Sequence, residues 1–95
     1  MRPPPSLISN LPVVLFTPID RRHEPTGNCR HTVGGGEFGP ASGLAICQDE
    51  DAYYLFYCDA DWEPVTDTWH QTIEAAKDQA EFEYRGVTST WEPAA

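Results

Sequence analysis

The chain has 95 residues, and its 15 acidic against 6 basic side chains give a formal net charge of −9 at pH 7. This length permits one domain with a small core, and 40% hydrophobic and 12% aromatic residues are too many for a disordered acidic chain. A surface this acidic disfavours nucleic acid and anionic lipid as partners and favours basic proteins. Residues 43–95 hold twelve of the acids against Lys77 and Arg85, so the charge is concentrated in the second half.

The first half of the chain is expected to contribute little regular structure. Residues 1–10 are rich in proline and are predicted to form a flexible arm. Residues 12–17 predict a short strand, which stops at Pro18 because proline lacks the amide that a sheet interior needs. Residues 20–42 are polar and rich in Gly and Pro, which indicates a long loop with a short extra strand near residues 29–33.

Three further strands are predicted at residues 43–48, 53–58 and 62–68. Acidic turns at residues 49–52 and 59–61 separate them, so the three runs predict an antiparallel meander. Both faces of the middle run are apolar or aromatic, which is typical of a central strand covered on two sides. A proline near the start of the last run indicates an edge strand or a bulge.

A helix is predicted to begin near Thr72, because a threonine at the N-cap accepts an orphan backbone amide. Its apolar face consists of Ile73, Ala76, Ala80 and Tyr84. Its acids are expected to face solvent; they are Glu74, Asp78, Glu81 and Glu83. Gly86 is expected to end the helix in the left-handed conformation, followed by a short strand or an extended tail around residues 87–91.

These elements predict an α+β fold, in which an antiparallel meander sheet of three to five strands carries one helix on one face. Residues 11–95 are expected to form a single domain. No apolar run reaches the about 20 residues of a membrane span, and the first residues lack the unbroken apolar stretch of a secretory signal. We therefore expect a soluble, cytoplasmic protein without a membrane partner.

The cysteines and histidines do not predict a metal site or a nucleophile. His23, Cys29 and His31 lie close together, but they lack the compact ligand pairs of a structural zinc site. Cys47 and Cys58 are interpreted as buried thiols in a reducing compartment, with a disulfide between them left open. The acids that follow Cys58 raise a thiol pKa, which opposes nucleophilic reactivity.

Two further motifs have simpler interpretations than ligand binding. Residues 34–39 match G-x-G-x-x-G, but no helical pattern follows, so a flexible glycine loop is favoured over a phosphate site. Asp59, Asp61 and Glu63 alternate as at the start of a calcium loop. The glycine that such a loop needs for its sharp turn is missing, and Pro64 occupies the next position, so a turn with a capping aspartate is favoured. We expect no enzyme activity, no cofactor and no metal.

Aromatic residues interleaved with acids are typical of a protein interface, although they are equally typical of a core with polar tips at its rim. His70 is interpreted as a contact to a partner or to the connecting segment. The candidate partner-binding residues are Asp49, Glu50, Asp51, Asp59, Asp61, Trp62, Glu63, Trp69 and His70. Stacking of nucleic-acid bases on these aromatics is disfavoured by the negative potential around them.

The second half of the chain resembles a group of small bacterial proteins of unknown function. The pattern that it shares with them is Cys-Asp-x-x-Trp from residue 58, Asp-Thr-x-His-x-Thr-x-Glu-x-Ala from residue 67, and Gln-Ala-x-x-Glu-Tyr from residue 79. More loosely, the order of a meander and a Thr-x-Glu-x-Ala helix is similar to antitoxins of the HicB type, and the small acidic domain resembles toxin immunity proteins. The resemblance to immunity proteins implies a basic toxin as partner.

The leading hypothesis is a non-enzymatic acidic binding protein, an immunity-type inhibitor that neutralises a bacterial toxin by occluding it. One alternative is a homodimeric accessory or regulatory domain that pairs through an exposed edge at residues 13–17. A second is a HicB-like antitoxin domain, although no basic or helical segment remains to bind DNA. A third is a small-ligand or catalytic protein, which requires His23, His31 or His70 to converge with carboxylates in a pocket under the loop at 20–42.

Overall fold

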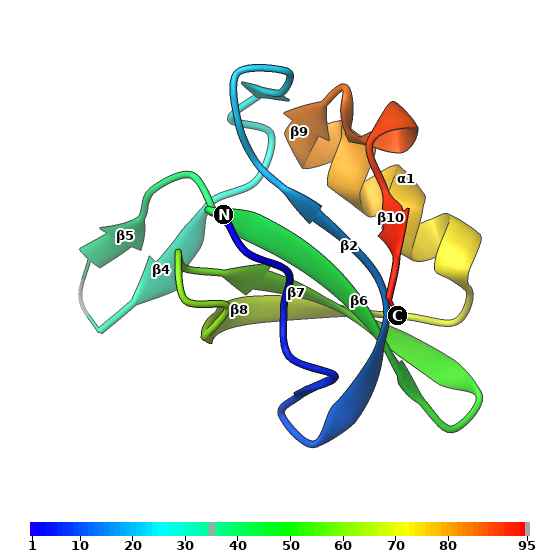
Figure 1. Ribbon diagram of the computed structural model, residues 1–95. Helices are drawn as coiled ribbons and strands as arrows, with labels where there is room; N and C mark the ends of the chain where they lie inside the picture. Colours follow the sequence, from blue (N-terminus) through cyan, green and yellow to red (C-terminus); the bar gives the residue numbers. More distant parts are fainter. Residues whose placement is uncertain (35, 95) are drawn as a thin grey trace.

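The computed structural model describes residues 1–34 and 36–94. In these residues a curled antiparallel sheet carries one α-helix on one face, so the predicted α+β fold is confirmed (Figure 1). Five strands cross the sheet in the order β1-β2-β6-β7-β8, and β10 also pairs with β2. The bounds of these elements are β1 Leu7–Ile8, β2 Leu11–Pro18, β6 Gly43–Asp49, β7 Ala52–Cys58, β8 Pro64–His70, α1 Ile73–Glu83 and β10 Glu92–Pro93.

Two short ladders lie outside the main sheet. They join β3 (Glu24–Pro25) to β9 (Tyr84–Arg85) and β4 (His31–Val33) to β5 (Gly36–Phe38). The extra strand expected near residues 29–33 is therefore confirmed as β4. The glycine motif at 34–39 was interpreted as a flexible loop, but it contains β5, the second strand of this hairpin; its Gly35 lies outside the described residues.

The predicted meander is confirmed as β6, β7 and β8, with a later start for the last strand. β8 begins at Pro64 because the preceding turn extends to Glu63: the Asp59 carboxylate accepts the backbone amides of Asp61 and Glu63 at 2.9 and 3.0 Å. This arrangement confirms the turn with a capping aspartate. The register shifts beside Cys58, opposite Pro64, so the predicted irregularity is also present.

β2 is an inner strand of the sheet. It pairs with β6 along residues 13–18, while β1 and β10 pair with its other side. The expectation of an exposed edge at residues 13–17 is therefore wrong, because two short strands from the two ends of the chain cover it. β1 lies within the segment 1–10 that was expected to be a flexible arm, and it places Ile8 in the core with 3% exposure.

The helix begins as predicted and ends earlier. Thr72 is its N-cap, and the Thr72 hydroxyl accepts the Ala75 amide at 3.0 Å. The helix stops at Glu83 because Tyr84–Arg85 leave it to pair with β3. Gly86 is left-handed, with φ of 105°, but it precedes a 3₁₀ turn at Val87–Ser89 and does not end the helix. None of the helices in the described residues has the length and apolar character needed to cross a membrane.

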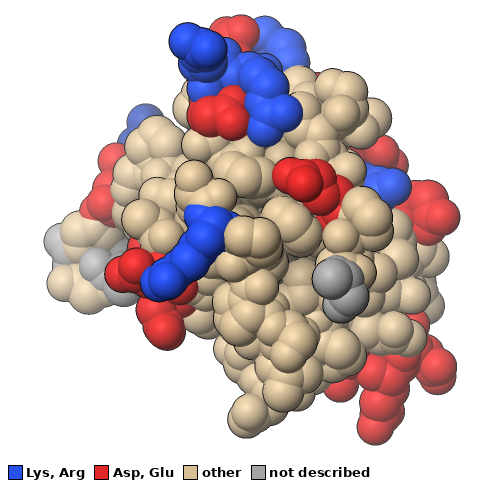
Figure 2. All heavy atoms as spheres, viewed as in Figure 1, with Lys and Arg blue, Asp and Glu red and all other residues tan. Residues whose placement is uncertain are grey.

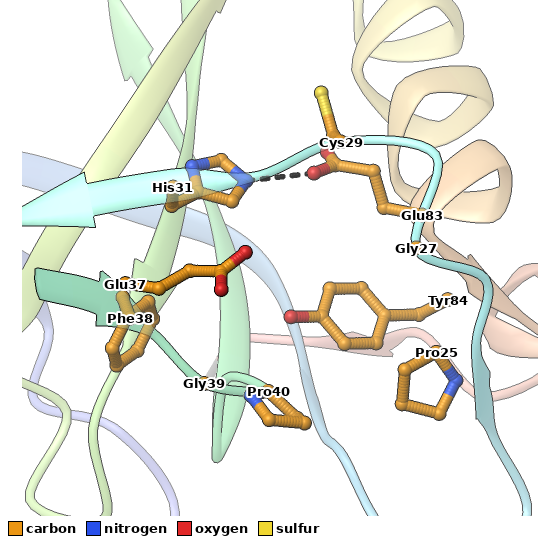
Figure 3. Close-up of a pocket in the computed structure, with 10 residues that line it drawn as sticks. All are labelled: Pro25, Gly27, Cys29, His31, Glu37, Phe38, Gly39, Pro40, Glu83 and Tyr84. Atoms are coloured by element: carbon orange, nitrogen blue, oxygen red, sulfur yellow. Dashed lines mark hydrogen bonds and ion pairs between the residues drawn. The ribbon is translucent and has the colours of Figure 1, made fainter.

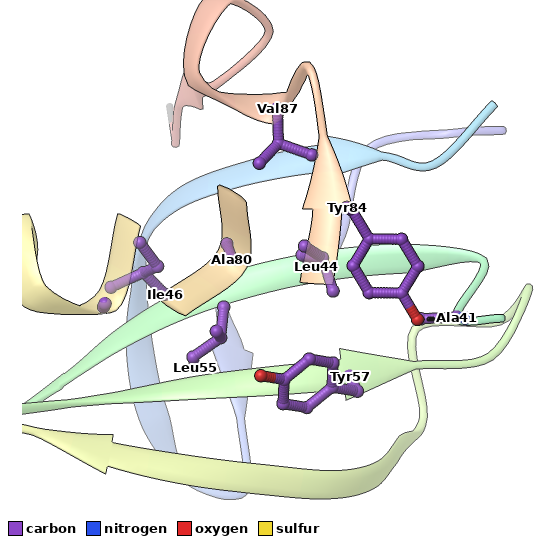
Figure 4. Packing of buried hydrophobic residues seen from close by; sticks show 9 residues of the cluster. Ala41, Leu44, Ile46, Leu55, Tyr57, Ala80, Tyr84 and Val87 are labelled. Carbon is purple, nitrogen blue, oxygen red and sulfur yellow. Dashed lines mark hydrogen bonds between the residues drawn. The ribbon is translucent and has the colours of Figure 1, made fainter. Parts of the chain in front are cut away.

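The sheet has an apolar core on each face. The helix side contains Leu44, Ile46 and Leu55 under Ala76 and Ala80, whose small side chains let α1 lie close to the sheet (Figure 4). The other face contains the residues Ile8, Val13, Phe16, Ala45, Cys47, Phe56, Cys58 and Trp62. Cys47 and Cys58 are free, fully buried thiols, and burial raises the pKa of each to about 12.

Replacing Thr72 with alanine is expected to lower the free energy of unfolding by about 1 kcal/mol, because the Ala75 amide loses its acceptor at an exposed helix end. Thr72→Ser, which keeps the hydroxyl, is the matched control and should stay within about 0.5 kcal/mol of the parent protein. Urea denaturation followed by circular dichroism measures both; equal losses for alanine and serine would rule out the capping role.

Candidate functional site

The nine predicted partner-binding residues do not form one surface. Asp49 ends β6 and Glu50 and Asp51 form the turn to β7, whereas residues 59–63 form the β7–β8 turn. These turns lie at opposite ends of β7, which has 7 residues and therefore spans roughly 20 Å. The two acidic turns are separate surfaces.

Trp62 was expected to be an exposed contact to a partner. It belongs instead to the apolar core on the face of the sheet opposite the helix. Its side chain is in a residue with only 3% exposure, and its ring meets Phe16 edge-on with centroids 5.9 Å apart. The indole Nε1 donates a hydrogen bond to the Arg2 carbonyl oxygen at 2.7 Å. The N-terminal segment therefore covers Trp62, and the β7–β8 turn presents acids without an aromatic contact.

Trp69 does lie on the surface, beside the acids of the other turn. It is 56% exposed and lines a shallow hollow with Asp49, Glu50, Asp51, Ala52 and Gln71. Acidic side chains gather over the β6–β7 turn at the lower right of Figure 2. Within the described residues, none of the ion pairs involves these three acids. We call Asp49, Glu50, Asp51 and Trp69 the Trp69 surface.

His70 lies on the opposite face of β8 from Trp69, because neighbouring residues of a strand point to opposite faces. Its Nε2 is 2.8 Å from the hydroxyl of Thr68, and burial lowers its pKa. His70 therefore does not belong to the Trp69 surface.

A cavity of about 330 Å³ lies between the end of α1 and the segment that was expected to be a long loop (Figure 3). Its lining residues are Pro25, Gly27, Cys29, His31, Glu37, Phe38, Gly39, Pro40, Glu83 and Tyr84. The side chain of Glu83 is 4% exposed, so the expectation that this acid faces solvent is wrong. Glu83 is buried where the end of α1 meets the β4–β5 hairpin.

The Glu83 carboxylate is surrounded by hydrogen-bonding groups. The Tyr57 hydroxyl and the Gln79 amide donate to Oε2, the latter at 3.1 Å, and His31 Nε2 lies 2.7 Å from Oε1. Burial is the main cause that raises the pKa of Tyr57 above its usual range, so Tyr57 is a neutral donor. This network accounts for the burial of a charged group, since each oxygen has a partner.

Two of the three residues first considered for zinc meet in this cavity. Single ligand atoms of Cys29, His31 and Glu83 all lie within 4.8 Å of one another. His23 lies elsewhere: its Nδ1 accepts the Asp20 amide, and its Nε2 is 2.8 Å from the Thr90 hydroxyl. Burial lowers the pKa of His23, consistent with a neutral structural imidazole.

Helical periodicity predicts the burial of Glu83, and the interpretation of the helix acids as a solvated face missed this signal. Glu83 follows Ala80 by three residues and Ala76 by seven, so helical periodicity places it on the same buried face. Tyr57 lies in the strand predicted at residues 53–58, but its hydrogen bond to Glu83 depends on the distance between sheet and helix, which no local pattern shows.

The fold and these surfaces define a small α+β protein with an exposed tryptophan in an acidic turn region and a cavity beside its helix. The chain matches no protein-family model, no curated protein and no solved structure. The resemblances to small bacterial proteins, HicB-type antitoxins and immunity proteins stay predictions.

Proposed function

We propose that the protein is a non-enzymatic binding protein that holds a basic protein partner through the Trp69 surface. The observation that carries this proposal is the 56% exposure of Trp69 beside three acids. A tryptophan at the centre of an interface contributes at least about 2 kcal/mol when a partner buries it. Acids around it speed association with a basic partner and disfavour acidic ones.

In its narrower form, the proposal is an immunity-type inhibitor that occludes a bacterial toxin. The net charge of −9 and the resemblance to immunity proteins support this partner class. Homodimerisation through β2 has lost its support, since β1 and β10 cover that strand. β8 is the last strand in the order of the sheet, so a homodimer could pair through β8 instead. Sedimentation of the purified chain tests for such a dimer.

The proposal predicts that variants of the Trp69 surface, beside the β6–β7 turn, lose the partner. Variants of the β7–β8 turn, at the other end of β7, should keep it. The purified chain and its variants are immobilised and incubated with a native lysate at low salt. The captured proteins are then quantified by mass spectrometry. Trp69→Ala and the double reversal Glu50→Lys with Asp51→Lys should each reduce a captured basic protein at least about 10-fold. With that partner purified, Trp69→Ala should raise Kd by about 30-fold or more.

The matched control reverses two acids of the other turn, Asp61→Lys with Glu63→Lys. Asp59 is left unchanged because its carboxylate caps the turn. This control changes the net charge by the same amount and should retain the partner. Equal binding by all variants, or equal loss in the control, would rule out the Trp69 surface.

A further inference from the structure

Three donor atoms of different chemistry converge in the cavity beside the helix. Cys29 lies in the loop before β4, His31 is the first residue of β4, and Glu83 is the last residue of α1 (Figure 3). Their ligand atoms lie within 4.8 Å of one another. A thiol, an imidazole and a carboxylate are the three protein ligand types that zinc accepts.

Each donor is already oriented by a second group. Thr66 Oγ1 lies 2.8 Å from Nδ1 of His31, which leaves Nε2 directed at Glu83. Tyr57 and Gln79 hold the carboxylate oxygen that does not contact His31. Such outer partners fix the tautomer and the direction of metal ligands in known sites. The Gln79 amide also lies 3.9 Å from Sγ of Cys29, so the same residue borders two of the donors.

The charge of the cluster favours a divalent cation. A thiolate at Cys29 and the carboxylate of Glu83 together carry the two negative charges that Zn²⁺ neutralises. Glu37 also lines the cavity, and its carboxylate is directed into it in Figure 3.

We propose that Cys29, His31 and Glu83 bind a zinc ion, with the fourth coordination position facing the cavity. This site goes beyond the proposed partner binding and does not depend on it. Zinc would take the place of the proton between His31 and Glu83, whose atoms now lie 2.7 Å apart. Tetrahedral bonds of about 2.0 to 2.1 Å separate two ligands by about 3.3 Å, so a small outward shift accommodates the ion.

The fourth ligand is then a water molecule or the Glu37 carboxylate. Glu37 is on β5, the strand paired with the one that begins at His31. Its present ion pair with Arg30 is 3.6 Å long and largely exposed, so it can be exchanged at little cost. Zinc would tie the β4–β5 hairpin to the end of α1.

The test uses the full, untagged chain after treatment with a chelator. Zn²⁺ is titrated calorimetrically, and Co²⁺ serves as a spectroscopic substitute. We expect one Zn²⁺ per chain, a thiolate-to-cobalt charge-transfer band and strong visible bands of tetrahedral cobalt. Cys29→Ser should abolish the charge-transfer band and weaken Zn²⁺ binding at least about 100-fold, and His31→Gln should weaken it as well.

Cys47→Ala is the matched control, because it removes a thiol that is fully buried on the other face of the sheet. It should keep the cobalt spectrum, and Zn²⁺ should raise the Tm of the parent and of this control but not that of Cys29→Ser. Glu24→Gln, at an exposed side chain, is a second control should Cys47→Ala fold poorly. No Zn²⁺ binding, a cobalt spectrum without thiolate character, or an unchanged affinity in Cys29→Ser would each overturn the proposal.

Discussion

Replacing Trp62 with alanine is expected to lower the free energy of unfolding by about 3–5 kcal/mol. The side chain is almost fully buried, packs on Phe16 and donates a hydrogen bond to the carbonyl of Arg2. Its loss leaves a cavity on one face of the sheet and removes the hydrogen bond that holds the carbonyl of Arg2. A domain of this size has about 5–15 kcal/mol of stability, so the variant should be close to unfolding. Urea denaturation followed by far-ultraviolet circular dichroism measures the change.

A second substitution tests whether the packing of Trp62 is the cause. A Cβ atom added at Gly43 would lie 2.5 and 2.7 Å from ring carbons of Trp62. Gly43→Ala alone should therefore cost about 1–3 kcal/mol, but much less in the Trp62→Ala background, where the ring is absent. Gly39→Ala is the matched control, because nothing lies within 4 Å of its added Cβ. Strictly additive losses at 43 and 62 would contradict the contact.

The elements that the sequence predicted correctly are those with local signals. Alternation and turn residues located β6, β7 and β8, and a threonine at the right position located the start of α1. The end of α1 was placed too late because it is decided by a pairing between residues 24–25 and 84–85, which are far apart in the chain. β10 likewise depends on long-range pairing with β2, whereas β1 pairs with β2 locally, across a two-residue turn at Ser9 and Asn10 that the interpretation of residues 1–10 as a flexible arm missed. Long-range contacts leave no periodicity in a short segment.

In the candidate sites, too, local signals predicted some features, and long-range contacts decide the others. The separation of the two acidic turns follows from the meander, since a hairpin connection at each end of β7 places them apart. Trp62 looked exposed because acids flank it, but its φ of 64° turns the chain and the N-terminal segment covers the ring. The cavity was not predicted from a sequence pattern; it was required by the hypothesis of a small-ligand or catalytic protein. His31 and Glu83 now meet in it, although the sequence alone could not bring residues 52 positions apart together.

The pattern that carries the resemblance to small bacterial proteins consists largely of residues with structural roles. In its first part, Cys58 is buried, Asp59 caps the turn and Trp62 fills the apolar core opposite the helix. In its last part, Gln79 donates to Glu83, and the Tyr84 hydroxyl accepts the Ala41 amide at 2.9 Å. The specified residues of the pattern therefore stabilise this fold. Trp69 occupies an unspecified position of the pattern, and the acids of the Trp69 surface and Cys29 precede it.

Replacing Glu83 with leucine is expected to lower the free energy of unfolding of the metal-free chain by about 3–5 kcal/mol. Leucine has a similar size, but it leaves the Tyr57 hydroxyl, the Gln79 amide and His31 without their acceptor. Glu83→Gln should cost less than about 1.5 kcal/mol, because its oxygen accepts from Tyr57 while its amide donates to His31. Chemical denaturation in the presence of a chelator measures both variants.

Removing the orphaned hydroxyl distinguishes an unsatisfied network from a simple packing defect. Adding Tyr57→Phe to Glu83→Leu should recover about 1–2 kcal/mol, although Tyr57→Phe alone destabilises the parent protein. Failure of this recovery would mean that the hydroxyl finds another partner and that Glu83 does not organise the cavity. The glutamine variant then separates two roles of the same residue. It should fold nearly as well as the parent and yet bind Zn²⁺ poorly, because a neutral amide is a weak ligand and leaves the charge of the ion uncompensated.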